Sequence, residues 1–259
     1  MTRRRFYAPP AAFEPDQKSA TLSAEETRHL RDVLRLDSGD EIYVFDGAGR
    51  EFHCAVQTIA KDSTELLVIS EVEPTCSESP LHLTLAIALL KGDKFDLAIQ
   101  KATELGVKRI VPLDTERADV RLRDREDAHK RVTRWRRIAL EAAKQTGRAF
   151  VPVISTPLTF NFLLMMSAVE DKESATNVAR IMFSERLGRS LPEATKSFPE
   201  RPTEIVALVG PEGGWTDEEI ELAREGGWEI VTLGGRTLRA ETAVIVVAAL
   251  LQHRFGDLL

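Results

Sequence analysis

The sequence has only two cysteines in 259 residues, and it has no apolar run long enough to cross a membrane. Cys54 and Cys76 are spaced neither as a CxxC pair nor as any other zinc-ligand motif, so no metal site is expected. Both thiols are expected to be small, partly buried side chains in a protein of a reducing compartment.

A signal peptide is not expected either, because three arginines and a proline-containing stretch follow Met1 where a continuous apolar segment would be needed. The longest apolar stretch, residues 243–251, is shorter than the roughly 18 residues that a transmembrane helix needs, and we predict that it forms a buried helix. These absences predict a cytoplasmic protein without a membrane partner.

Excess positive charge is also missing, since the formal net charge is -6. Arginine is nevertheless concentrated in three clusters: Arg3, Arg4 and Arg5; Arg28, Arg31 and Arg35; and residues 117–137, which include Arg121 and Arg123. Guanidinium groups match phosphate oxygens in shape and charge, so these clusters are candidate contacts to a polyanion. The alternatives are a disordered basic tail for the first cluster and a solvated helix face for the third, where acidic residues are interleaved.

Residues 1–73 have the pattern of a small β domain. Segments rich in β-branched and aromatic residues at 41–45, 50–59 and 65–72 predict strands. A helix is expected at residues 23–36, with Ser23 as N-cap and Glu26 completing a capping box. Several short strands with one helix predict a small β-barrel. Residues 74–80 are polar, include two prolines and form the predicted linker.

From residue 81 to residue 259, predicted strands and helices alternate. Strands are expected at residues 83–89, 109–113, 151–154, 179–184, 205–209 and 229–233. Helices are expected at 94–105, 127–145, 160–166 and 240–255, and another between the N-cap Thr216 and Gly226. This alternation predicts an α/β domain with a mostly parallel sheet and helices on both faces.

Two of these strands end in glycine-bearing loops, Gly210-Pro-Glu-Gly-Gly214 and Gly234-Gly-Arg-Thr-Leu-Arg-Ala-Glu-Thr242. Ligands of parallel sheets bind outside the carboxyl ends of the strands, and glycine lets the main chain approach them closely. Neither loop has the GxGxxG or GK[ST] pattern of nucleotide sites, and Glu212 would repel a phosphate. Main-chain contacts of this kind could hold a cofactor with an adenine ring, a ribose and a charged amino-acid end. Tight turns without a ligand are the alternative.

Seven segments carry a resemblance to a known family, in order and over essentially the whole chain. They are Arg3-Arg-Arg-Phe-Tyr7, His29-Leu-Arg-Asp-Val-Leu-Arg35 with Gly39-Asp40, Lys91-Gly-Asp-Lys94, Glu104-Leu-Gly-Val107, Glu141-Ala-Ala-Lys-Gln145 with Arg148, Gly210-Pro-Glu-Gly-Gly214, and Leu233-Gly-Gly-Arg-Thr-Leu-Arg-Ala-Glu-Thr-Ala243. The sequence thereby resembles the RsmE-type ribosomal RNA small-subunit methyltransferases of the SPOUT superfamily. It departs from them at Trp215, where the family often has Phe, and at Thr237, where an aliphatic residue is usual.

The resemblance implies methylation of N3 of a uridine in 16S rRNA of the small ribosomal subunit, with S-adenosyl-L-methionine as cofactor. It implies a PUA-like RNA-binding barrel at residues 1–73, a SPOUT domain at 81–259 with a deep trefoil knot at about 205–259, and a homodimer. The implied cofactor contacts are Leu208, Gly210, Pro211, Glu212, Gly213, Gly214, Leu233, Gly234, Arg236, Leu238 and Thr242. The implied RNA contacts are Arg3, Arg4, Arg5, Arg31, Arg35, Arg121 and Arg123.

The chemistry of N3 methylation suggests which side chains act. The N3–H group lies on the Watson–Crick edge, so the base must be unpaired and must lose a proton to a general base. Glu241 is the candidate base, although a carboxylate at a helix start can simply stabilise the helix dipole. Arg239 and Arg236 are candidates for binding the uracil oxygens or a phosphate, and Arg5 is a further catalytic candidate.

Two other functions stay open at this point. One is a related SPOUT enzyme that methylates a ribose 2′-OH or a tRNA base. The other is a non-catalytic RNA-binding factor for ribosome assembly whose cofactor site has decayed. The intact loop glycines, together with Arg239 and Glu241, argue against such decay.

Overall fold

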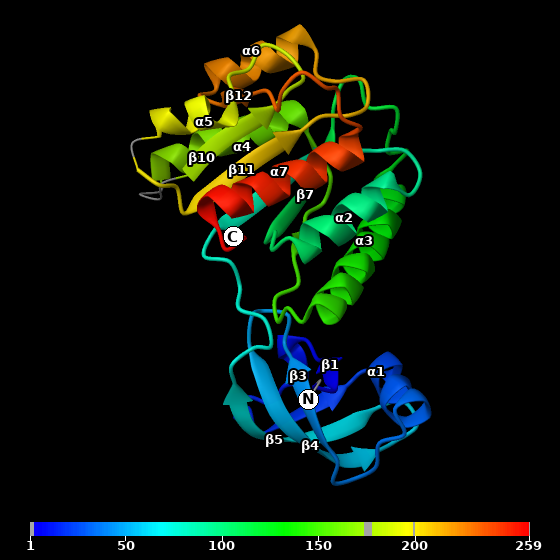
Figure 1. Ribbon diagram of the computed structural model, residues 1–259. Coiled ribbons are helices and arrows are strands. Elements are labelled where there is room, and N and C mark those ends of the chain that lie inside the picture. Colours follow the sequence, from blue (N-terminus) through cyan, green and yellow to red (C-terminus); the bar gives the residue numbers. More distant parts are fainter. Residues whose placement is uncertain (1–2, 174–177, 199, 259) are drawn as a thin grey trace. The chain divides into compact units, whose positions relative to one another are not determined.

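The computed structural model describes residues 3–173, 178–198 and 200–258, which form two compact units (Figure 1). The first unit contains Met1–Glu78 and Leu140–Val151, and the second contains Ser79–Ala139 and Pro152–Leu259. The first boundary falls within the predicted linker. The return of residues 140–151 to the first unit was not predicted from the sequence.

The first unit is built on a curled five-stranded sheet with the order β1-β3-β4-β5-β2. Its strands are β1 (Arg5–Tyr7), β2 (Ser19–Leu22), β3 (Glu41–Phe45), β4 (Glu51–Ile59) and β5 (Thr64–Val72), and its short helices are η1 (Pro10–Ala12), α1 (Ala24–Arg28) and η2 (His29–Val33). β1 pairs with β3 in parallel, and the other pairings are antiparallel. The structure thus confirms a small N-terminal β domain.

Alternation along the strands places apolar side chains inside the curl of this sheet. Ile42 and Val44 of β3 are fully buried, as are Cys54 of β4 and Leu66 of β5. They belong to one core that also includes Phe6, Leu22, Leu30 and Phe52. Burial removes apolar surface from water, which is the main driving force for this packing.

The predicted capping box at residues 23–26 is only half formed. Ser23 accepts a hydrogen bond from the Glu26 N–H at 3.4 Å, as an N-cap does. The carboxylate of Glu26 instead accepts from Lys144 and from the Tyr7 N–H. The return of residues 140–151 supplies this lysine, so a long-range ion pair replaces the local contact.

The second unit contains a seven-stranded sheet with the order β12-β10-β11-β6-β7-β8, in which β9 also pairs with β7. Its strands are β6 (His82–Ala88), β7 (Arg109–Asp114), β8 (Val153–Ile154), β9 (Leu158–Thr159), β10 (Val178–Phe183), β11 (Glu204–Val209) and β12 (Glu229–Val231). All these pairings are parallel, which confirms the predicted parallel sheet.

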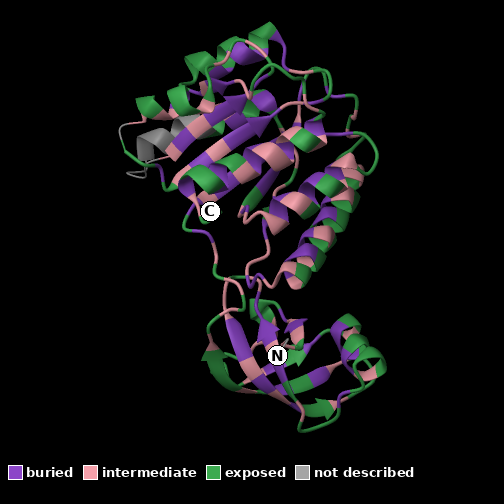
Figure 2. Ribbon diagram, viewed as in Figure 1, coloured by how far each residue is buried: buried purple, intermediate pink, exposed green. Residues whose placement is uncertain are grey.

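Helices cover both faces of this sheet. They are α2 (Lys94–Glu104), α3 (Arg125–Thr146), α4 (Phe160–Glu173), α5 (Leu191–Ala194), α6 (Asp217–Glu225) and α7 (Ala240–Phe255), with a short η3 (Thr195–Ser197). α2 and α7 pack on each other on one face, where α7 contacts β6 and β11 (Figure 1). α4 and α6 share a core with the other face through residues such as Leu208 and Trp228. The central strands are buried on both sides (Figure 2).

The predicted knot at residues 205–259 concerns how the chain threads, which strand order alone does not fix. It stays a prediction.

Polar contacts tie residues 140–151 to the remainder of the first unit. Lys144 pairs with Glu26, whose side chain is only 6% exposed, and Arg148 pairs with Glu78 at 2.6 Å. The main chain also contributes, since Val151 N–H donates to Gly47 O at 3.0 Å. Each of these charged groups is buried or half-buried and has a partner of opposite charge, as burial requires.

Neither a membrane-spanning helix nor a metal-binding cluster is found in the part of the chain that the structure describes. None of the helices there is both long enough and apolar enough to cross a bilayer. No three His, Cys, Asp or Glu side chains in the same part are grouped closely enough to hold a metal ion.

Candidate active site

The carboxyl ends of three neighbouring parallel strands, β12, β10 and β11, open onto one cavity of about 170 Å³ in the second unit. Parallel neighbours end at the same edge of a sheet, so the loops that follow them meet there. The lining residues are Phe183, Ser184 and Glu185 after β10; Val209, Gly210, Pro211, Glu212, Gly213, Gly214 and Trp215 at the end of β11; Leu233, Gly234, Arg236, Thr237 and Leu238 after β12; and Ala240 and Ala243 of α7.

The loop after β11 depends on Gly214. Its φ of +68° lies in the left-handed region that favours glycine. A Cβ at this position would lie 2.5 Å from Oε1 of Glu185. The Gly214 N–H donates to Pro211 O at 3.0 Å and closes the turn. Glycine is therefore required for the loop to turn here and for the Glu185 carboxylate to lie against it.

Trp215 connects this loop to the end of β10. Its indole N–H donates to Phe183 O at 2.8 Å, and its ring is 1% exposed. A Cβ on Gly210 would lie 2.9 Å from the indole nitrogen, so that glycine makes room for the ring. Next along the chain, Thr216 caps α6 and forms a capping box with Glu219, as predicted. The first loop is thus anchored at both ends.

The loop after β12 has an open main chain. Gly234 has a φ of +109°, and a Cβ on Gly234 or Gly235 would meet no atom within 4 Å. Leu233 and Leu238 are half-buried and give this side of the cavity an apolar wall. A ligand can therefore approach both the backbone and an apolar surface here.

A cluster of charges lies beside the cavity. Lys94, the first residue of α2, donates a hydrogen bond to Oε1 of Glu212 at 2.9 Å. The same ammonium lies 3.9 Å from Oε2 of Glu241, on the first turn of α7. That oxygen is buried and has no hydrogen-bond partner among the described residues. The cluster joins residues of the first loop, the last helix and α2.

The pairing affects the ionisation of both partners. The hydrogen bond to Glu212 raises the pKa of Lys94 above its ordinary value, and attraction to Glu212 and Glu241 adds to this against dehydration and the charge of Arg239. Burial works to raise the pKa of Glu212, but hydrogen bonds from Lys94 and from main-chain N–H groups outweigh it and lower that pKa. Both groups are therefore charged at neutral pH.

The cavity lining contains nine of the eleven residues predicted to bind the cofactor: Gly210, Pro211, Glu212, Gly213, Gly214, Leu233, Gly234, Arg236 and Leu238. Leu208 instead belongs to the core that β11 shares with α4 and α6. Thr242 is exposed on α7. Their neighbours Val209 and Ala243 line the cavity.

Sequence reasoning missed the contribution of β10. Phe183, Ser184 and Glu185 line the cavity, but they come before the single glycine of the loop after this strand, Gly188, which is not among the lining residues. The available signal was the position of these residues at a strand end, and it becomes useful only once β10 is known to lie beside β11. Lys94 was also missed as a site residue, although it belongs to one of the family-like segments.

The three predicted catalytic residues fall in both units. Arg239 is the exposed N-cap of α7, and its charge acts on Lys94. Glu241 follows two residues later, with a side chain only 13% exposed. Arg5 belongs to β1 of the first unit.

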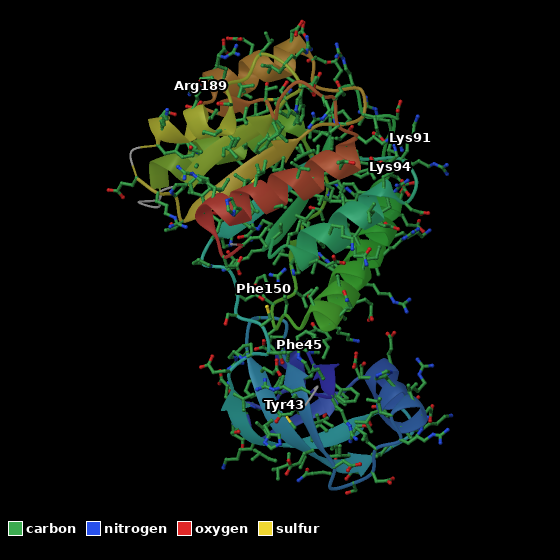
Figure 3. All side chains as sticks on the ribbon, in the orientation of Figure 1. Tyr43, Phe45, Lys91, Lys94, Phe150 and Arg189 are labelled. Carbon is green, nitrogen blue, oxygen red and sulfur yellow. The ribbon has the colours of Figure 1, made fainter. Side chains whose placement is uncertain are left out.

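Arg3 and Arg5 share a buried carboxylate. They lie 2.8 Å and 3.0 Å from Glu51, whose side chain is fully buried. Their guanidinium groups also stack on Tyr43 and Phe45, at 4.6 Å and 4.7 Å from the ring centres, and Figure 3 labels both rings on β3. Two charges of this cluster are thus engaged within the unit itself.

The other predicted RNA contacts are on the surface of their own units. Arg31 is half-buried and pairs with Asp32 at 2.7 Å. Four more arginines are exposed: Arg4 and Arg35 in the first unit, and Arg121 and Arg123 in the second. Arg121 pairs with Asp114 at the end of β7.

Two domain families match the chain. An RNA methyltransferase domain matches residues 77–252, and an RNA methyltransferase PUA domain matches residues 22–69. A ribosomal RNA small subunit methyltransferase E of Synechocystis is 37% identical over 96% of this chain and 77% of its own. That of Bacillus subtilis is 32% identical over 90% of each chain.

Solved structures agree with these matches. The ribosomal RNA small subunit methyltransferase E of Neisseria gonorrhoeae, bound to S-adenosyl methionine, is similar over 100% of both chains, with a TM-score of 0.82 and 32% identity. A methyltransferase of Legionella pneumophila in complex with the same cofactor covers 99% of this chain and 100% of its own, with a TM-score of 0.82 and 30% identity. The chain therefore belongs to the RNA methyltransferase family that includes the ribosomal RNA small subunit methyltransferases E.

Proposed function

We propose that this protein transfers the methyl group of S-adenosyl-L-methionine to N3 of one uridine in 16S rRNA of the small ribosomal subunit. The observation that carries the proposal is the cavity at the ends of β10, β11 and β12, in a chain of an RNA methyltransferase family. Its relatives in Synechocystis and Bacillus subtilis are named for action on small subunit ribosomal RNA.

The residues of the cavity suit this cofactor. Val209, Leu233 and Leu238 provide apolar walls for an adenine ring, and Gly234 provides an open main chain for hydrogen bonds. Glu185 adds a carboxylate, which complements the positive charge of a sulfonium or an ammonium group. When bound, the cofactor supplies an electrophilic methyl group on sulfur.

The chain's own side chains would prepare the uracil. Glu241 accepts the N3 proton, because its Oε2 has no hydrogen-bond donor among the described residues. Arg239 and Arg236 bind the uracil oxygens or a neighbouring phosphate from the exposed loop before α7. Arg5 supports catalysis from the first unit by holding the RNA.

RNA recognition is assigned to the arginines of both units. The proposed division along the sequence is residues 1–73 as the RNA-binding domain, 74–80 as linker and 81–259 as the methyltransferase domain, from which residues 140–151 return to the first unit. The exposed side chains of Arg4, Arg35 and Arg123 are available to phosphates. Arg3, Arg5, Arg31 and Arg121, which have acidic partners within their own units, add to them. The protein is proposed to act as a homodimer.

The test is methyl transfer from labelled S-adenosyl-L-methionine to 30S particles that lack the modification, followed by nucleoside mass spectrometry and mapping. The expected product is N3-methyluridine at a single 16S position. If the labelled methyl group were found on a ribose 2′-OH or on tRNA, the cofactor in the proposal would be right and the acceptor would be wrong. Cofactor binding without any transfer would instead favour an assembly factor.

Two substitutions test the roles of α7 residues. Arg239→Ala and Glu241→Ala should each lower the single-turnover rate by about 10²-fold or more, since charge stabilisation and general-base catalysis contribute on that scale. Calorimetry with S-adenosyl-L-methionine should show binding close to that of the unsubstituted protein. Normal rates in folded, cofactor-binding variants would remove these residues from the mechanism.

A further inference from the structure

The carboxylate oxygen of Glu241 that has no hydrogen-bond partner among the described residues lies near a donor, the ammonium of Lys94. Oε2 of Glu241 is buried without a hydrogen-bond partner in the described residues, and Nζ of Lys94 is 3.9 Å away, too far to bond it. A buried carboxylate oxygen left without a donor is costly, so a ligand that supplies an N–H group there would be stabilised.

Lys94 also has donor capacity beyond its bond to Glu212. An ammonium carries three N–H groups, and one of them is directed to Oε1 of Glu212 at 2.9 Å. The side chain of Lys94 is 36% exposed, so the ammonium is accessible to a ligand. Figure 3 labels Lys94 where α2 begins, close to the start of α7. Next to the cavity wall at Glu212 there is thus an acceptor without a donor and, beside it, a charged donor.

This pair has the complementary pattern to the imide edge of uracil. That edge presents the N3–H donor between two carbonyl acceptors, O2 and O4. A carboxylate opposite N3–H and an ammonium opposite one carbonyl would satisfy two of these three groups. Cytosine, with an unprotonated N3, would set a lone pair against the carboxylate.

We propose that Lys94 is a catalytic residue that binds a uracil carbonyl oxygen while Glu241 accepts the N3 proton. This inference rests on the proposed function, and it adds to Arg239 and Arg236 a further group that stabilises negative charge on the base. As the proton passes to Glu241, charge spreads from N3 to the carbonyl oxygens, where the Lys94 ammonium stabilises it. N3 then forms a bond to the methyl carbon while the carbon–sulfur bond breaks and its electron pair stays on sulfur. The proton leaves Glu241 for water after the product departs.

The bond to Glu212 keeps Lys94 in place for this role. Glu212 belongs to the loop after β11, so the ammonium is held between the cavity wall and α7. The raised pKa of Lys94 keeps it charged at neutral pH. Donors aimed at developing charge act best when fixed in advance, because no reorganisation is needed during the reaction.

The decisive variant is Lys94→Met, with Lys101→Met as matched control. Lys101 lies on the same helix, is 35% exposed and pairs with Glu104 at 2.8 Å. It therefore resembles Lys94 in exposure and in having an acidic partner, but it lies away from Glu212 and Glu241. At saturating cofactor and RNA, Lys94→Met should lower the single-turnover rate about 10²-fold to 10³-fold, the scale found for one such donor. Lys101→Met should leave it within about twofold. The affinity for S-adenosyl-L-methionine, measured by calorimetry, should change little in either variant.

An electronic test separates charge stabilisation from a structural role. Replacing the target uridine by 5-fluorouridine makes N3–H more acidic, so less charge stabilisation is needed from the protein. The rate deficit of Lys94→Met should then shrink at least tenfold, whereas a merely structural defect would be the same on both RNAs. Lys94→Arg, which keeps the charge, should recover part of the rate.

Three results would overturn the inference. They are a normal single-turnover rate in Lys94→Met, a deficit equal on both RNAs, or a deficit that disappears when the cofactor concentration is raised further. The last would show that Lys94 only positions Glu212. Failure of the proposed function is distinguishable, because the unsubstituted protein would then give no N3-methyluridine at all.

Discussion

The buried carboxylate of Glu51 offers a quantitative test of how the first unit is held together. It accepts hydrogen bonds from Arg3 at 2.8 Å, Arg5 at 3.1 Å and the Thr75 N–H at 3.2 Å. Glu51→Gln keeps the shape of the side chain but removes its charge. A hydrogen bond to a charged group contributes about 1.5–3 kcal/mol, and Arg3 is 31% exposed, so its share is discounted for solvent screening. We therefore expect Glu51→Gln to lower the free energy of unfolding of the first unit by about 3 kcal/mol.

The pH dependence of this loss has a definite sign. Burial works to raise the pKa of Glu51, but hydrogen bonds from Arg3, Thr75 and Arg5 outweigh it and lower the pKa below its ordinary value. A carboxyl whose pKa is lower in the folded state stabilises the fold above its unfolded pKa of about 4.3. That stabilisation is lost as the pH falls through the folded pKa. The difference in free energy of unfolding between the unsubstituted protein and Glu51→Gln should therefore have its full value at pH 7 and shrink below about pH 4.

The assay must report on the two units separately. All three tryptophans, Trp135, Trp215 and Trp228, belong to the second unit, so their fluorescence during urea unfolding follows that unit alone. Hydrogen exchange of β4 peptides, read by mass spectrometry, follows the first unit. Glu71→Gln, an exposed carboxylate on β5, is the control. The reasoning would be refuted if the β4 peptides showed a loss of stability below about 1 kcal/mol in Glu51→Gln, or if the same loss persisted at low pH.

Two further predictions concern the cofactor loop and the thiols. Gly214→Ala should weaken S-adenosyl-L-methionine binding at least about tenfold by calorimetry, because a left-handed φ costs about 1–2 kcal/mol and the new Cβ would clash with Glu185. Gly227→Ala has similar strain at φ +78° with no atom within 4 Å, so unchanged binding in that control is expected, and equal weakening in both would contradict the role of the cavity. Iodoacetamide at pH 8 should label Cys76 and spare Cys54, because burial raises the pKa of Cys54 to about 12. Rapid labelling of Cys54 in the folded protein, detected by mass spectrometry, would disprove its burial.

Elements with a strong local signal could be predicted closely from the sequence. The expected strand at 41–45 and helix at 240–255 coincide with β3 and α7, because β-branched and aromatic residues mark the first and a long apolar stretch marks the second. β1 and β2 were missed, since three or four residues are too few to show a period and their pairing with β3 and β5 defines them. The expected strand at 151–154 is reduced to Val153–Ile154, because Val151 is hydrogen-bonded in the first unit.

The residues of the site also fall into those with a local sequence signal and those that depend on the fold. The two glycine loops were visible because glycine at a strand end is a local signal. Lys94 is 118 residues away from Glu212 in sequence, and no local pattern states that the two will meet. Glu185 needed the strand order, which places β10 beside β11. Long-range neighbours of a local motif are therefore the part of the site that only the fold supplies.

The divided first unit has a consequence for how the protein is made on the ribosome. Its apolar core comes from residues 6–68 and can collapse early in synthesis, when domains generally fold from the N-terminus. Glu26 and Glu78, however, obtain Lys144 and Arg148 only after α3 has been translated. The N-terminal unit therefore matures in two stages, first as a nascent barrel with unpaired carboxylates and later as a closed unit when residues 140–151 emerge.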